Sequence, residues 1–314
     1  AALATGFIPL LATSLIPALV LRFLTGMVLA GVYPVGMKIM TTWTREDRGL
    51  GIGMLVGALT IGSAAPHLLN ALGGVGDWRL VMYLAAGLAL LGAGIALAFV
   101  KEGPYRSPSP RLSLSHLRNI LRDRDIVLVN LGYLGHMWEL FAMWAWIQAF
   151  LLASFKQSGV GEIWASATTF VVIAAGSLGS LAAGVAADRI GRTTTIIIAL
   201  GLSGTCALGI GFLYGHSPVI LGLVAVIWGV AVVADSAQFS ACVSELADRK
   251  IVGTALTLQT SLGFLLTLVT IRFIPTVENV VGWEWAFAFL ALGPLVGIWV
   301  MLTLRQQESA VRLA

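Results

Sequence analysis

Long apolar segments alternate with short polar segments along almost the whole sequence. A membrane-spanning helix needs about 20 predominantly apolar residues, and nine segments reach that length. We therefore predict spanning helices at residues 15–40, 49–72, 79–100, 126–155, 163–187, 193–214, 218–242, 251–274 and 284–304. Residues 1–12 read as the end of one further span. The pattern predicts an all-α, polytopic membrane protein.

The composition agrees with this prediction. Hydrophobic residues make up 58% of the chain and charged residues 11%, and the mean hydropathy is +0.92. Soluble domains carry about 25% charged residues, so a soluble protein is excluded. The net charge of +4 does not indicate nucleic-acid binding, because the Lys and Arg residues lie between apolar segments rather than on one face. Cys206 and Cys242 lie in separate spans without metal-ligand spacing, so we expect them to be packing residues, with neither metal nor cofactor bound.

The basic residues indicate how the spans are oriented. With the polar turn at residues 184–192 in the cytoplasm, fifteen Lys and Arg residues fall at cytoplasmic helix ends. Arg79, Lys156 and Arg272 fall at outer ends, and Arg22 lies inside a span. Cytoplasmic loops of membrane proteins carry an excess of Lys and Arg. We therefore expect a multi-pass protein of the cell (inner or plasma) membrane with its C-terminus in the cytoplasm.

The chain repeats itself weakly. The Asp-Arg pair at residues 47–48 recurs at 248–249, an offset of 248 − 47 = 201, and Gly62 matches Gly263 at the same offset. Internal repeats are common in secondary transporters. The repeat predicts an incomplete N-terminal helical bundle, a cytoplasmic central loop, a C-terminal six-helix bundle and a cytoplasmic tail, at residues 1–100, 101–125, 126–304 and 305–314. The same offset places the match of the helix at Thr193 before Ala1, so we expect about two and a half helices of a twelve-helix protein to precede this sequence.

The central loop contains one stretch with helical spacing. Leu114, Leu117 and Leu121 recur three to four residues apart, with Arg118 and Arg122 between them. Such a pattern is typical of a short basic amphipathic helix lying on the inner leaflet. A solvated linker is the alternative.

The turn at residues 184–192 carries the most specific motif of the chain. It reads G-x-x-x-D-R-x-G-R, with defined positions at Gly184, Asp188, Arg189, Gly191 and Arg192. Gly184 lets another helix pack closely, Gly191 can adopt a positive φ, and the two Arg residues can contact the cytoplasmic surface. The spacing resembles the loop signature of the major facilitator superfamily (MFS). This resemblance implies a two-bundle fold that works by alternating access, in which the motif acts as a cytoplasmic gate.

A second resemblance lies in the first predicted full span. Arg22 and Gly26 form an Arg-x-x-x-Gly sequence similar to the family's fourth-helix motif, which implies a role in proton or substrate handling. Ionisable residues inside membrane spans are costly and are usually functional or internally paired. The alternative is an arginine near a helix end that extends to the outer interface.

Polar residues also lie deep in the second half of the chain. His136 and Glu139 lie one helical turn apart near the middle of the 126–155 span, with Trp138 beside them. A buried carboxylate suits a proton carrier. The alternative is that neighbouring groups satisfy the hydrogen bonds of both residues. A lone His-x-x-Glu is a weak metal signal, and the sequence offers no further ligands.

Three more residues extend this polar set. Asp235 and Gln238 share a face of the 218–242 span, and Gln259 lies in the next span. Asp235 is either a cavity residue or the cap of an interrupted helix. Together with Arg22, His136, Trp138 and Glu139, these residues are the candidates for the substrate and coupling site.

The residues and the resemblance together predict a secondary active transporter and not an enzyme. We expect a monomer in the lipid bilayer that moves a small solute, for which an anion is one candidate, with protons as the coupling ion. A drug or metabolite efflux antiporter and a non-transporting receptor or scaffold on the same fold are the alternatives. An intramembrane enzyme is disfavoured because Ser177 and Ser180 have no His in their own span.

Overall fold

The computed structural model describes residues 1–44, 48–72, 78–105, 114–248 and 251–307. All regular secondary structure in this part of the chain is helical. Nine of the described helical segments are long and apolar enough to cross a membrane, and the shorter apolar helix α1 (Ala2–Leu11) precedes them. The prediction of an all-α polytopic membrane protein with nine full spans and one partial span is confirmed.

The first group of helices runs from α1 to α5. After α1 come α2 (Leu15–Leu29), α3 (Tyr33–Trp43), α4 (Arg48–Ala71) and α5 (Trp78–Phe99). The span predicted at residues 15–40 therefore consists of two consecutive helices. Its interruption has a local cause, because Pro34 lies in the first turn of α3 and has no N–H with which to continue the hydrogen bonds of α2.

The second group follows the loop helix α6 (Leu114–Arg122). Its long helices are α7 (Arg124–Gln157), α8 (Glu162–Ile190), α9 (Arg192–Gly209), α10 (Pro218–Ala234), α11 (Ser236–Leu246), α12 (Val252–Val281) and α14 (Leu292–Leu304). The short segments η1 (Ile210–Leu213), α13 (Trp283–Ala286) and η2 (Phe287–Ala291) complete it.

Two further spans differ from the prediction in detail. The span predicted at 218–242 is present as Pro218–Leu246, but it consists of two helices that meet at Asp235. The span at 251–274 continues to Val281, because α12 accommodates Pro275 in its interior, as membrane helices can.

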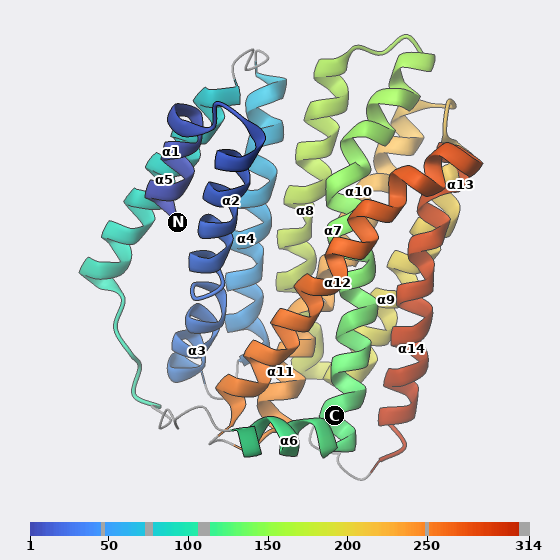
Figure 1. Cartoon of the computed structure of the whole chain (residues 1–314). Coiled ribbons are helices and arrows are strands. Elements are labelled where there is room, and N and C mark those ends of the chain that lie inside the picture. The colour runs from blue at the N-terminus through green and yellow to red at the C-terminus, as the bar shows by residue number, and fades with distance from the viewer. Residues whose placement is uncertain (45–47, 73–77, 106–113, 249–250, 308–314) are drawn as a thin grey trace.

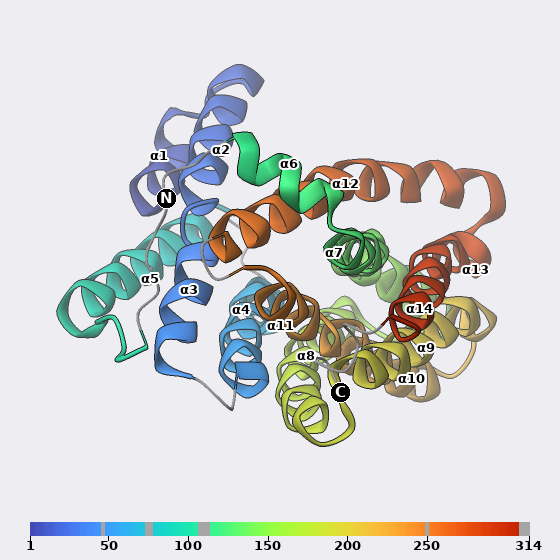
Figure 2. The same cartoon turned by 90° about the horizontal axis from the view of Figure 1, so that it is seen from below.

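The two groups of helices lie side by side, with α1 to α5 on one side and α7 to α14 on the other (Figure 1). Helix α6 crosses the lower end of the molecule beneath α7 and α12, as the view from below shows (Figure 2). Ile120 of α6 is fully buried, whereas Arg118, Leu121 and Arg122 are exposed. The central loop therefore contains the amphipathic helix, and the turn between α8 and α9 lies at the same end of the molecule.

Helices α4 and α8 form the main contact between the two groups. Ser180 Oγ donates a hydrogen bond to the carbonyl oxygen of Gly53 at 3.1 Å. A Cβ atom on Gly53 would lie 2.8 Å from the carbonyl oxygen of Ser180, so only glycine permits this approach. Near the other end of α4, His67 Nδ1 lies 2.7 Å from Gln148 Oε1 of α7. Both ends of α4 thus contact the second group.

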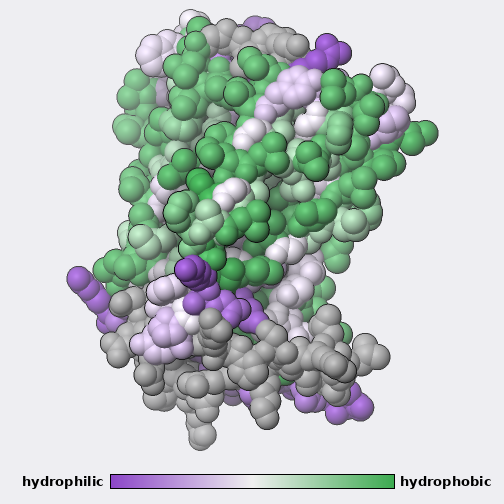
Figure 3. Space-filling view, turned by 90° about the vertical axis from the view of Figure 1, so that its left-hand side faces the viewer, coloured by the Kyte–Doolittle hydropathy of each residue, from purple (hydrophilic) through white to green (hydrophobic). Residues whose placement is uncertain are grey.

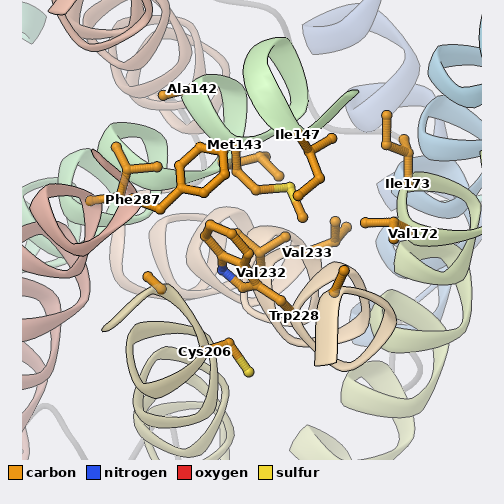
Figure 4. Packing of buried hydrophobic residues seen from close by; sticks show 14 of the residues in the cluster. Ala142, Met143, Ile147, Val172, Ile173, Cys206, Trp228, Val232, Val233 and Phe287 are labelled. Atoms are coloured by element: carbon orange, nitrogen blue, oxygen red, sulfur yellow. The ribbon is translucent and has the colours of Figure 1, made fainter. Parts of the chain in front are cut away.

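The second group has a dense apolar core. Trp228, Phe287 and Met143 are almost completely buried, and they point toward one another from α10, η2 and α7 (Figure 4). The side of the molecule formed by the first group is covered mostly by hydrophobic residues, with hydrophilic ones gathered toward its lower end (Figure 3). Leu97 and Phe99 of α5 are 90% and 77% exposed. A surface of this kind fits contact with lipid tails rather than with water.

Candidate functional site

Glu139 lies in α7 and faces α9 and α10. Ser203 Oγ donates a hydrogen bond to Glu139 Oε2 at 2.9 Å, and Trp228 Nε1 donates one to Oε1 at 2.7 Å. All three side chains are buried. Among the described residues, no Lys or Arg side chain pairs with this carboxylate. Its partners are therefore neutral, and a proton can bind without an ion pair being broken.

His136 lies one turn before Glu139 on the same helix. Its Nδ1 lies 2.8 Å from Asp235 Oδ1, and both side chains are buried. Asp235 occupies the interruption between α10 and α11, but its carboxylate does not cap α11. The backbone carbonyl of Asp235 instead accepts the N–H groups of Gln238 and Phe239, at 3.0 and 3.1 Å. Of the two roles considered for Asp235, the geometry disfavours the side-chain cap.

These two contacts join α7 to the α10–α11 segment at two levels. Glu139 reaches from α7 to Trp228 of α10, and Asp235 reaches back to His136 of α7. The rings of Tyr133 and Phe239 flank His136, with centroid distances of 5.8 and 6.0 Å. The sequence-predicted residues His136, Glu139 and Asp235 are thus brought together.

Several buried polar atoms around this centre lack a hydrogen-bond partner within the described part of the chain. They belong to four of the predicted residues and to one that the predictions omitted, and they are His136 Nε2, Asp235 Oδ2, Gln238 Nε2, both amide atoms of Gln259, and Asn130 Oδ1. Buried polar atoms in proteins are nearly always paired, so each exception needs an explanation. A bound ligand or water would supply the missing partners.

The signature turn is connected to this centre through Arg192. Gly191 adopts a φ of 84°, as a tight reversal requires. Arg192 then turns inward instead of contacting the cytoplasmic surface. Its Nε donates to both carboxylate oxygens of Glu245 at 2.9 Å, and its Nη2 lies 2.7 Å from Glu245 Oε1. Asp188 Oδ1 lies farther away, at 3.7 Å from Nη2.

The same guanidinium group reaches the predicted centre. Arg192 Nη1 donates a hydrogen bond to Gln238 Oε1 at 3.0 Å. Gln238 lies one helical turn after Asp235, and its side chain is fully buried. Arg189 is exposed and Gly184 is buried in α8, so the five motif residues lie in different environments.

Two predicted site residues lie elsewhere. Arg22 is exposed, and its Nη2 lies 3.7 Å from Met82 Sδ of α5. Trp138 packs against Phe289 of η2, with ring centroids 5.1 Å apart, and its Nε1 donates to the carbonyl oxygen of Phe289 at 3.4 Å. The structure does not bring either residue to the His136–Asp235 pair.

Sequence reasoning missed four residues of the site. Asn130 and Glu245 carry a visible signal, because each is polar and lies within or at the end of an apolar segment. Ser203 and Trp228 carry none, since serine and tryptophan are common in membrane helices and only the fold directs them toward Glu139.

An apolar groove of about 370 Å³ lies away from this centre, between α3, α4 and the end of α5. Its lining includes Met40, Trp43, Leu55 and Phe99, with Lys101 at one edge. None of the predicted site residues lines it.

Comparison with known proteins identifies the fold independently. The family model described as Major Facilitator Superfamily matches residues 1–270. One solved structure that resembles this chain is the crystal structure of the human organic anion transporter MFSD10 (TETRAN), with a TM-score of 0.73 and 18% sequence identity. The alignment covers 96% of this chain and 75% of that chain. A search of curated protein sequences gives no significant match.

Proposed function

Because the chain belongs to the Major Facilitator Superfamily, we propose that it is a secondary transporter that moves a small organic anion together with protons. The observation that carries this proposal is the pair of buried carboxylates between α7 and the α10–α11 segment. Glu139 is held by Trp228 and Ser203, Asp235 lies beside His136, and no described Lys or Arg pairs with either carboxylate. Ionisable groups of this kind inside a membrane protein are typical of proton and substrate pathways.

Two features support an anionic substrate. The structural neighbour MFSD10 is named as an organic anion transporter. The helices around the centre also carry buried donors without partners in the described chain, at the amide nitrogens of Gln238 in α11 and Gln259 in α12. A protonated His136 adds a third donor at Nε2, because both nitrogens of imidazolium carry hydrogen. The oxygens of a carboxylate, sulfonate or phosphate group can accept from all three.

The same geometry supplies a reason for proton coupling. An anion that approaches Glu139 and Asp235 is repelled while both carboxylates are ionised, since like charges at short range disfavour each other in a medium of low dielectric constant. Protonation of Glu139 or of His136 reduces this repulsion. Binding of the anion and binding of a proton therefore favour each other, as symport requires.

Alternating access would use the contacts between the two groups of helices. We propose that the bundles at residues 1–100 and 126–304 rock about the α4–α8 contact, while the Arg192–Glu245 contact holds the cytoplasmic end of the second bundle. In the proposed orientation the turn between α8 and α9 and the C-terminus face the cytoplasm.

Proteoliposomes test the proposal. The protein is reconstituted, and uptake of labelled succinate, glutarate and hippurate is measured with and without an inward proton gradient. Accumulation of at least one anion that depends on the gradient, and that a protonophore abolishes, is the expected result. Equal uptake by liposomes with and without protein, for all three anions, would contradict the proposal.

A further inference from the structure

The amide of Gln238 has a fixed polarity. Arg192 Nη1 donates to Gln238 Oε1 at 3.0 Å. A guanidinium group has only donors, so the carbonyl end of the amide must face it. The Nε2 end, with its two hydrogens, must therefore face the other way.

Arg192 is itself held in place by a stronger contact. Glu245 receives hydrogen bonds from its Nε and lies 2.7 Å from its Nη2, an arrangement in which a carboxylate and a guanidinium meet through two nitrogens. The guanidinium therefore cannot rotate away without breaking a charge-assisted pair. The orientation of the Gln238 amide is thus set by Arg192 of the signature turn.

The free end of this amide has no partner. Gln238 Nε2 is buried and makes no hydrogen bond within the described part of the chain. Asp235 lies one turn away, at the interruption of the helix, and its Oδ2 is buried and unpaired as well. Gln259 of α12 is also buried with an unpaired amide. A buried N–H₂ group without a hydrogen-bond partner gains from a ligand that brings an acceptor to it.

We propose that Gln238 is a substrate-recognition residue. Arg192 fixes the orientation of its amide, so the free N–H₂ end selects a hydrogen-bond acceptor such as a carboxylate oxygen. This inference rests on the proposed anion transport and adds to it the residue that distinguishes an anion from a neutral analogue. A charged acceptor forms stronger hydrogen bonds with an amide than a neutral one.

The test uses matched ligands and matched variants. Thermal stabilisation of the purified protein is measured with succinate, glutarate and hippurate, and with the primary amide of each acid. The variants are Gln238→Glu, Gln238→Met and, as a control, Gln306→Glu, which makes the same chemical change at an exposed position beyond α14. Gln238→Glu keeps an acceptor for Arg192 but replaces the free donor by an oxygen, whereas Gln238→Met removes both amide groups at similar size.

The wild-type protein and Gln306→Glu are expected to prefer a carboxylate to its amide. Gln238→Glu should weaken carboxylate binding about tenfold or more and reverse that preference, and Gln238→Met should reduce the preference. A purely structural role for Gln238 would weaken binding of acid and amide equally, and that outcome would overturn the inference. If Gln238→Glu does not fold, the ratio of acid to amide binding in Gln238→Met decides.

The outcomes separate the two proposals. Wild-type binding of a carboxylate with an unchanged acid-to-amide ratio in both Gln238 variants overturns the inference and leaves anion transport standing. Failure of the wild-type protein to bind or transport any of the carboxylates overturns the proposed function, and the inference with it.

Discussion

Trp228 Nε1 and Glu139 Oε1 lie 2.7 Å apart and join α10 to α7 in the interior of the second bundle. Trp228 is completely buried, and the hydrogen bond occupies the one polar atom of its side chain. The bond therefore serves both partners, since it pairs the indole N–H and gives the carboxylate a neutral donor. Its loss would leave a buried carboxylate with Ser203 as its remaining hydrogen-bond donor in the described chain.

The first prediction concerns this bond. Trp228→Phe keeps an aromatic ring but removes the donor, and it should lower the free energy of unfolding by about 1–3 kcal/mol. Trp144→Phe is the matched control, because Trp144 Nε1 is buried without a described partner and its removal breaks no hydrogen bond. Chemical unfolding in detergent measures both variants. Equal destabilisation would mean that ring volume, and not the bond to Glu139, accounts for the role of Trp228.

Glu139→Gln tests the coupling role. The amide cannot bind and release a proton, so accumulation driven by a proton gradient should be lost, while exchange of labelled for unlabelled anion across the membrane should persist. Glu162→Gln, at the exposed start of α8, is the control and should leave both activities unchanged. Normal gradient-driven accumulation by Glu139→Gln would make Glu139 structural and would pass the coupling role to Asp235.

The signature turn gives a prediction about relative effects. Glu245 lies 2.7 Å from Arg192 Nη2 and Asp188 lies 3.7 Å from it. Removal of the closer charge should therefore shift the conformers further, so Glu245→Gln should open the cytoplasmic side more than Asp188→Asn does. A difference of about 1 kcal/mol corresponds to a several-fold change in population. Labelling rates of cysteines introduced at the cytoplasmic end measure the shift, and a larger effect of Asp188→Asn would contradict this assignment.

The α4–α8 contact predicts opposite outcomes for two glycines of one helix. Gly53→Ala places a methyl group 2.8 Å from the carbonyl oxygen of Ser180, so it should destabilise the protein by about 1–3 kcal/mol. A Cβ atom on Gly62 would meet nothing within 4 Å, so Gly62→Ala should be neutral or stabilising by up to about 1 kcal/mol through helix propensity. Unfolding curves of the two variants provide the comparison. Similar values for both would mean that α4 does not pack closely on α8.

Much of the fold is predictable from the sequence because a membrane span is a property of local composition. The positions of α4, α5, α7 and α8 follow from apolar length alone. The sequence leaves the interruption at Asp235 open, since the polar residues Ser236, Gln238 and Ser240 that follow it fit a cavity lining as well as a break in the helix. The end of α12 at Val281 is likewise not predictable from composition. It depends on whether the helix tolerates Pro275 in its interior.

The candidate site is only partly predictable for a related reason. Sequence gives the depth of a polar residue in its span but not the helix that it faces. His136 and Asp235 meet because α7 packs against the α10–α11 segment, and no local pattern encodes that contact. Arg22 was also expected inside a span and at the site, yet its Nη2 lies near Met82 Sδ of α5. Arg192 was expected at the cytoplasmic surface, but an acidic partner in α11 draws it inward, because a paired charge can be buried where an unpaired one cannot.

The central claim is that anion binding and proton binding favour each other at the pair of buried carboxylates. Proton uptake on binding tests it most directly. The purified protein is titrated with the carboxylate that stabilises it best, in lightly buffered solution containing a pH-sensitive dye, with Glu139→Gln and Asp235→Asn measured alongside. The account predicts that the wild-type protein takes up protons as the anion binds, that its affinity falls as the pH rises, and that at least one variant loses the uptake. Anion binding with no proton uptake and with an affinity independent of pH would contradict it.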